Sequence, residues 1–318
     1  MFKLQVRLAL ALVPFLAATL ASAAQLSTDA RGAIPHDLQQ MVVIDYRAMQ
    51  NSQAAMDLRE RVMPPELRQF DDALRKSGLN DNHDVDQLAF ALFRPVNSNS
   101  EMLDTVGIAQ GQFSMEDILA NFRKQKLRAT LVRGNRIYPM TKAGLVLCFV
   151  DPSTMVFGQK EAVVKSLDAR DGLTPSLLSN GVMMDAMRSV DTEPLWSILD
   201  EKGTQTMMKQ LLGEAGSVAD YDTVRKRLEA SWYSMNFQHG VKFDLTIQTG
   251  DTFAAATVSS LLTAAVLVRK MSGSDAEKAA LTNTSISSSS GKLMVHFGAN
   301  DSEFANLLQS SLFKSVVR

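Results

Sequence analysis

The residues best spaced for nucleophilic chemistry are two lysines that each follow a serine by three positions. Ser289 precedes Lys292 and Ser311 precedes Lys314, and in penicillin-binding enzymes a lysine at this spacing can activate the serine hydroxyl. Those enzymes also need a Lys-Ser-Gly or Lys-Thr-Gly segment after the serine, but Lys76–Gly78 comes before both pairs. The sequence also lacks a Gly-x-Ser-x-Gly elbow. We interpret both pairs as chance matches and predict no catalytic residues.

Metal ligation has equally little support in the spacing of its usual ligands. Asn82, Asp84 and Asp86 alternate as in a calcium loop, but Gln87 and Phe93 stand where that loop needs glycine and a bidentate glutamate. No histidine lies within four residues of another, which excludes a local zinc motif; the four are His36, His83, His239 and His296. We predict a polar turn before a central strand, no metal site and no bound cofactor.

The sulfur-bearing residues invite a copper or thiol hypothesis. The chain has 17 methionines, with Met183, Met184 and Met187 close together and Met207 and Met208 further on. Thioethers bind cuprous copper, but methionine also fills irregular cores, and no histidine cluster accompanies these residues. The single cysteine, Cys148, lies inside an apolar run. We predict core packing for all of them.

One stretch departs from the near-neutral balance of the chain. No acidic residue occurs between Asp117 and Asp151, while seven basic residues do: Arg123, Lys124, Lys126, Arg128, Arg133, Arg136 and Lys142. Such residues keep edge strands soluble and suit the C-terminal end of a helix. Alternatively, they form a patch for anionic lipid headgroups, polysaccharide or an acidic partner in the cell envelope.

The N-terminus has the pattern of a secretory signal peptide. Lys3 and Arg7 precede the apolar stretch Leu8–Leu20, and Ala21–Ala23 supplies the small residues of a cleavage site. We expect residues 1–24 to be removed and the protein to be periplasmic or secreted, with no transmembrane span after cleavage. Removal takes the formal charge from −1 to −3, which excludes a dedicated nucleic-acid binder.

The elements that follow are arranged similarly in two halves. The first half predicts a strand at Met41–Asp45, a helix interrupted at the prolines 64 and 65, strands at 88–93 and 106–110, and a helix capped by Ser114. A further strand at 127–131 turns at Gly134-Asn135 into a strand at Ile137 and Tyr138. Two more strands follow at 145–150 and 155–157, before a helix at 161–167.

The second half predicts the same order. A strand at 196–199 precedes helices at 206–212 and 221–228, two alternating strands turn at Gly240, and helices at 252–270 and 274–280 follow. Strands near Ser285 and at 293–297 lead to a last helix at 301–312. We interpret this as an internal duplication with repeats at residues 33–172 and 176–318.

Phe253–Val268 is a run of sixteen residues without a charge. It falls short of the roughly 20 residues of a membrane span, and it contains Thr257, Ser259, Ser260 and Thr263. We predict a helix packed on the second sheet, with a lipid-contacting helix as the alternative.

The segments IPHDLQQMVVIDY, SGLNDNHDVDQLAFAL and GLVLCFVDPSTMVFGQ resemble a group of uncharacterised exported bacterial α+β proteins with duplicated domains. The predicted fold is α+β, with two similar domains, each an antiparallel sheet with helices on one face. We expect a non-enzymatic binding or scaffold protein of the cell envelope. The alternatives are a periplasmic carrier of a hydrophobic or lipidic ligand, and a hydrolase whose site is assembled from scattered residues.

Overall fold

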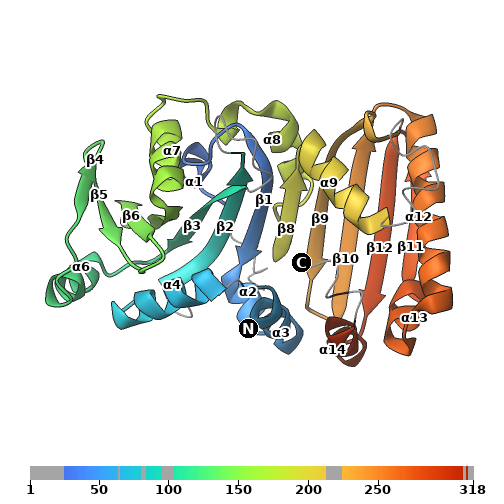
Figure 1. Ribbon diagram of the computed structural model, residues 1–318, viewed down its shortest axis with the longest axis horizontal. Helices are drawn as coiled ribbons and strands as arrows, with labels where there is room; N and C mark the ends of the chain where they lie inside the picture. The colour runs from blue at the N-terminus through green and yellow to red at the C-terminus, as the bar shows by residue number, and fades with distance from the viewer. Residues whose placement is uncertain are drawn as a thin grey trace, which may run out of the picture.

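The computed structural model describes residues 25–63, 65–79, 84–94, 103–212, 224–310 and 313. The expected signal peptide, residues 1–24, lies outside the described residues, as do His83 and the pair Ser311 and Lys314. The fold is α+β and is built on one large antiparallel sheet (Figure 1). The predicted fold class is therefore confirmed.

The first half alternates short helices with strands, most of them at the predicted places. Its elements are α1 (Thr28–Gly32), β1 (Leu38–Asp45), α2 (Tyr46–Gln50), α3 (Gln53–Val62), α4 (Pro65–Lys76), β2 (Val85–Phe93), β3 (Asp104–Gly111), α6 (Met115–Lys124), β4 (Thr130–Val132), β5 (Asn135–Pro139), β6 (Leu145–Asp151), β7 (Thr154–Gln159) and α7 (Lys160–Arg170).

The second half has longer, more regular strands and the longest helix. Its elements are η1 (Leu177–Ser179), α8 (Gly181–Arg188), β8 (Leu195–Leu199), α9 (Glu201–Leu212), β9 (Leu228–Asn236), β10 (Val241–Thr249), α12 (Thr252–Ser272), α13 (Asp275–Thr282), β11 (Thr284–Ser289), β12 (Lys292–Ala299) and α14 (Asp301–Gln309). A capping box formed by Ser274 and Glu277 begins α13, which starts where the sequence predicted a helix.

All twelve strands of the described residues belong to one sheet, in the order β11-β12-β10-β9-β8-β1-β2-β3-β7-β6-β5-β4. The halves share a strand order: β1-β2-β3-β7-β6 in the first matches β8-β9-β10-β12-β11 in the second, and β5 and β4 extend the first half further. The halves meet where β1 pairs with β8. The sequence predicted a separate sheet in each half. Instead, the first strands of the two halves pair and make one continuous sheet.

The two faces of the sheet follow from the strand register, because side chains alternate between faces along each strand. The front face is defined by a row of cross-strand neighbours: Tyr138, Leu147, Phe157, Gly107, Phe90, Val42, Ser197, Tyr233, Leu245, Val295 and Ile286. Helices α4 and α6 cover this face in the first half, and α9 and α12 cover it in the second.

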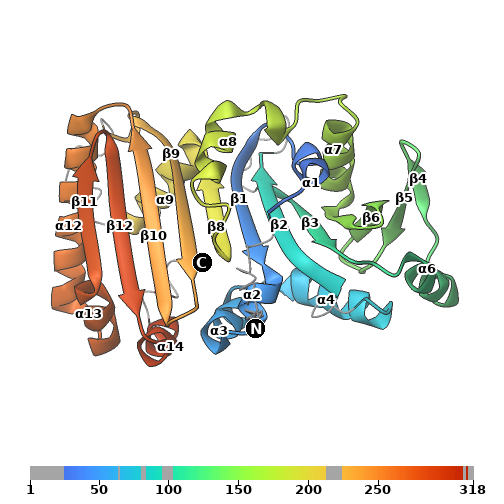
Figure 2. The ribbon, with the colours of Figure 1, turned by 180° about the vertical axis from the view of Figure 1, so that it is seen from behind.

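The back face changes character along the matching row. It runs through Ile137, Cys148, Val156, Ile108, Ala89, Val43, Trp196, Ser234, Asp244, His296 and Ser285. The apolar part, up to Trp196, packs against α1, α7 and α8. The polar part lies on β9–β12; α8 packs against β9, and Figure 2 shows no described helix over the back face of β10–β12. Helices thus pack on both faces in the first half, because β1–β3 are apolar on both sides.

Three local predictions differ from the structure. The hairpin between β4 and β5 turns at Arg133 and Gly134, which both have positive φ, one residue earlier than expected. Ser114 precedes α6, but its side chain makes no cap hydrogen bond. Of the helix expected at 221–228, residues 221–223 lie outside the described residues, Val224 and Arg225 are helical, and Leu228 already belongs to β9.

Candidate functional site

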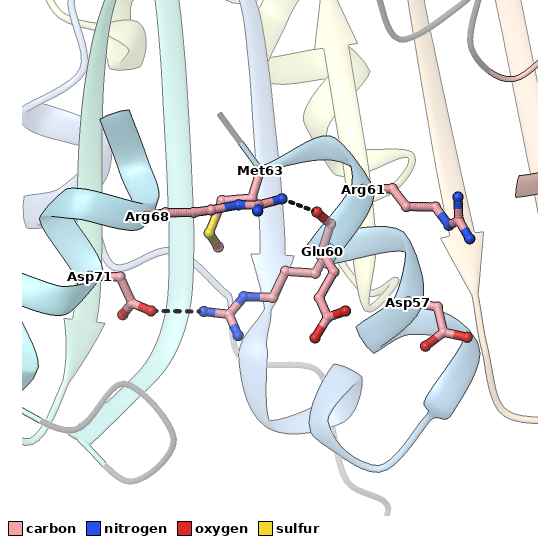
Figure 3. A pocket seen from close by; sticks show the side chains of 7 residues that line it. Asp57, Glu60, Arg61, Met63, Arg68 and Asp71 are labelled. Atoms are coloured by element: carbon pink, nitrogen blue, oxygen red, sulfur yellow. Dashed lines mark hydrogen bonds and ion pairs between the residues drawn. The ribbon is translucent and has the colours of Figure 1, made fainter. Parts of the chain in front are cut away.

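One hollow, of about 630 Å³, lies where α3 meets α4 (Figure 3). Its lining is almost entirely charged: Asp57, Arg59, Glu60, Arg61, Met63, Arg68 and Asp71. The guanidinium groups already have partners. Arg59 lies 3.6 Å from the Asp71 carboxylate, Arg68 donates to the Glu60 carbonyl, and Arg61 donates to the Leu308 carbonyl at 3.2 Å. The three arginines and the three carboxylates of the lining balance in charge, and each guanidinium already has a protein oxygen as its partner.

A second hollow, of about 760 Å³, lies at the end of β3. Most of the residues that line it have polar or charged side chains: Arg47, Gln50, Asn51, Asp84, Gly111, Gln112, Phe113, Ser114, Pro152 and Ser153. Arg47 is paired with Asp86 at 2.5 Å. Pockets that hold small hydrophobic ligands are mainly apolar. Neither hollow therefore fits the alternative of a hydrophobic-ligand carrier.

The arrangement most similar to a catalytic triad lies on the back face of β10–β12, which we call the bare back face. His296 lies between Asp244 and Ser285 in the strand register, and its Nδ1 is 2.7 Å from Asp244 Oδ1. The order resembles an acid, base and nucleophile, but Ser285 makes no hydrogen bond to His296 in the described structure. The His296 and Asp244 side chains are 52% and 61% exposed. An activated serine needs that hydrogen bond in a site that excludes water, so the row is a solvated polar ladder.

The other sequence candidates for chemistry do not assemble into a site. Lys292 directs its ammonium over the Trp232 ring, 5.3 Å from the centroid, while the Ser289 hydroxyl lies 3.4 Å from that of Ser290. Within the described residues, no three of the His, Cys, Asp and Glu side chains gather as a metal site would require.

One half-buried carboxylate has a raised pKa. Burial raises the pKa of Asp200, and this effect outweighs the hydrogen bond from the Gly203 backbone N–H and the nearby charge of Arg94. Asp200 Oδ1 accepts from Gly203 N at 2.7 Å, in the first turn of α9. It lines neither hollow, so its role is to hold the start of the helix.

The two methionine groups singled out in the sequence pack in cores, as predicted, but Met271 and Met294 are 85% and 39% exposed. Met183 and Met187 are buried against the back face, whereas Met208 is buried between α9 and the front face. Cys148 is fully buried, and burial raises the pKa of its thiol to about 11. A thiol with this pKa is protonated and unreactive at neutral pH.

The outer side of α12 exposes apolar residues that the packing of the fold does not explain. Six positions spaced three or four residues apart share this side and are all exposed: Phe253, Ala256, Ser260, Ala264, Leu267 and Met271. We call them the outer stripe. Phe253, Leu267 and Met271 are 74%, 57% and 85% exposed, and neighbouring Val268 is 61% exposed. The stripe carries no charge over roughly 27 Å, from the helical rise per residue.

The opposite side of α12 holds the helix on the sheet with small residues. Ala254, Ala255, Val258, Leu262 and Ala265 are buried there. α12 is long and apolar enough to cross a membrane, but only 28% of its most apolar stretch is buried in the protein. The expected packing on the second sheet is therefore present along one side, and the remaining apolar surface faces outward.

The hydroxyl groups of α12 do not make its exposed side polar. Thr257, Ser260 and Thr263 each donate to the backbone carbonyl four residues earlier, at 2.9, 3.0 and 2.8 Å. Ser272 does the same at 3.2 Å. Each donor is satisfied within the helix, so these side chains can enter an apolar medium without an unpaired hydrogen.

The seven basic residues of the sequence are all exposed, but the fold separates Arg133 from the other six. Arg133 reaches Asp168 of α7, where its Nη2 donates at 3.2 Å, whereas the others surround the end of α6 and the outer hairpin. The sequence pattern could identify this group and the uncharged run of α12. It could not identify which side of α12 faces outward, because apolar and small residues occur all around that helix.

Comparisons with known proteins show only the fold. No family model and no curated protein matches this sequence. Crystal form I of TP0453 is similar in structure, with a TM-score of 0.52 at 12% identity, covering 93% of this chain and 98% of that one. Crystal forms III and IV give TM-scores of 0.45 and 0.46 at 10% and 9% identity, covering 89% and 88% of this chain and 98% and 96% of theirs. The chain thus shares its overall fold with TP0453.

Proposed function

We propose that this chain is an exported, non-enzymatic binding protein of the cell envelope that docks on a membrane surface through α12. The observation that carries the proposal is the outer stripe, an exposed apolar surface on a long helix. Exposed apolar patches of this kind mark interaction sites, because leaving them in water is unfavourable.

A lipid surface fits the stripe better than another protein does. The self-satisfied hydroxyls of Thr257, Ser260 and Thr263 offer a partner protein few hydrogen bonds but suit the acyl boundary. Arg269 and Lys270 follow the uncharged run, and long basic side chains at a helix end reach toward headgroups. Because one side of α12 is packed on the sheet, the helix lies along the interface rather than across it.

The test is flotation with phosphatidylcholine vesicles, which carry no net charge. Replacement of Leu267 by Glu puts a charge into the docking side, and we expect vesicle affinity to fall at least about tenfold. The matched control is Leu173→Glu, because Leu173 is 60% exposed and lies in a loop far along the chain from α12. Equal loss in both variants, or equal binding by both, would contradict the proposal.

A fluorescent label can show which side of α12 meets the lipid. Cys148 is buried and its pKa is raised, so a cysteine introduced by Ser260→Cys is the reactive thiol of the folded protein. An environment-sensitive fluorophore there should shift to the blue when vesicles are added. The same label introduced by Ser285→Cys, on the bare back face, should not shift.

A further inference from the structure

The basic residues around the outer hairpin form a second exposed surface at the far end of the sheet from α12. Arg123 and Lys124 lie in the last turn of α6, and Lys126 follows the C-cap residue Gln125 in a left-handed conformation with φ of 56°. Arg128 follows before β4, and Lys142 lies in the turn after β5. All five side chains are exposed.

Strand register divides the remaining two arginines between the faces. Arg136 precedes Tyr138 by two residues on β5, so both point to the front face. Arg133 lies in the turn and pairs with Asp168 on α7, which covers the back face. The uncompensated set is therefore Arg123, Lys124, Lys126, Arg128, Arg136 and Lys142, which we call the basic end. No described carboxylate forms an ion pair with any of them.

An exposed leucine lies within the basic end. Leu131 pairs with Arg136 across the hairpin and is 69% exposed, on the same front face. A soluble polyanion would neutralise the cations but leave Leu131 in water. A bilayer with anionic headgroups matches both features, because phosphates meet the cations while a leucine side chain enters the acyl boundary.

We propose that the basic end is a second membrane contact and that it selects anionic lipid headgroups. It lies on the same sheet face as α12, and Figure 1 shows α6 and α12 at opposite ends of that face. Two contacts are the usual requirement for stable peripheral binding, because one apolar contact alone is readily reversed. The inference takes its partner from the proposed function but rests on different residues.

The experiment compares vesicles of phosphatidylcholine alone with vesicles that also contain phosphatidylglycerol, at low and high salt. Each basic side chain near an anionic surface contributes about fivefold in affinity. The double variant Arg128→Glu, Arg136→Glu should therefore bind the anionic vesicles at least about 25-fold more weakly than the unmodified protein. Its binding to phosphatidylcholine vesicles should stay unchanged, since α12 is intact.

The matched control reverses the same number of charges elsewhere. Arg188→Glu with Lys242→Glu changes the net charge equally, and both residues are exposed, on α8 and on the bare back face. This control should keep most of its affinity for anionic vesicles. The part of the affinity that depends on phosphatidylglycerol should also weaken in high salt, because exposed charges are screened.

Two results would overturn the inference while leaving α12 untouched. One is equal binding to the two kinds of vesicle. The other is a salt-sensitive affinity for polyglutamate that the Arg128→Glu, Arg136→Glu variant loses while vesicle binding is unaffected, which would make a soluble polyanion the partner. Conversely, if the protein binds anionic vesicles but does not bind phosphatidylcholine vesicles, the proposed role of α12 is wrong and that of the basic end is supported.

Discussion

At the scale of single residues, Cys148 illustrates how burial replaces reactivity. Its side chain lies on the apolar part of the back face, opposite Ile137 and Val156 in the neighbouring strands. Burial raises the pKa of the thiol from 9.0 to about 11, and the charge of Arg170 lowers it only partly. The thiol therefore behaves as a small apolar group, which agrees with its place in the run Leu145–Val150.

The raised pKa predicts a stability loss at high pH. Between about pH 9 and pH 11, the unfolded thiol loses its proton while the folded thiol keeps it, so stability falls as pH rises through this window. Relative to Cys148→Ala, the wild-type protein should lose on the order of 2 kcal/mol of unfolding free energy there. Urea unfolding of both proteins across the window measures this, and parallel pH profiles would disprove it.

At the scale of elements, α9 is fixed by a close approach to β1 at Gly203. A Cβ at Gly203 would lie 2.6 Å from the Gln39 carbonyl oxygen, which already accepts from Asp200 N at 3.0 Å. A side chain at position 203 must push the first turn of α9 away from the start of β1. The glycine is therefore needed for the position of the helix.

Replacing Gly203 by Ala should destabilise the protein by about 1–3 kcal/mol, through the strain of overpacking. Gly181, at the start of α8, is the matched control because a Cβ there meets nothing within 4 Å. Gly181→Ala should be neutral or stabilising by up to about 1 kcal/mol, since alanine restricts the unfolded chain. Chemical unfolding of both variants gives the comparison, and equal effects would refute the argument.

Elements with a clear local signal could be predicted from sequence, and those set by distant contacts could not. The alternation of Val241, Phe243 and Leu245 predicts the half-buried strand β10, because a polar residue follows each one. The hairpin after β4 was misplaced by one residue, because Arg133 adopts a positive φ that glycine usually supplies. The outward side of α12 depends on where the sheet and α9 lie, which the sequence of the helix does not encode.

At the scale of the whole molecule, the pairing of β1 with β8 joins the two halves of the chain in one sheet. The sequence of neither strand predicts this pairing. Both strands are largely apolar on both faces, so each could equally be a central strand of its own sheet. Trp196 of β8 is buried in the core formed by β1–β3 and α7. On the front face, Ser197 shares hydrogen bonds with Gln40 of β1 and Tyr233 of β9. The core of the first half thus includes a strand of the second.

Because the halves share strands and core, they should unfold together. The two tryptophans, Trp196 and Trp232, lie on β8 and β9, so fluorescence reports on the second half near the junction, while far-UV circular dichroism reports on the whole chain. We expect the two signals to give coincident urea transitions. Ser197→Pro removes a ladder N–H of β8 that faces β9, next to the junction, and should lower both midpoints together, by about 3 kcal/mol or more in unfolding free energy. Ser197→Ala separates out the loss of the hydroxyl, and a second transition in either variant would mean that the halves fold as independent domains.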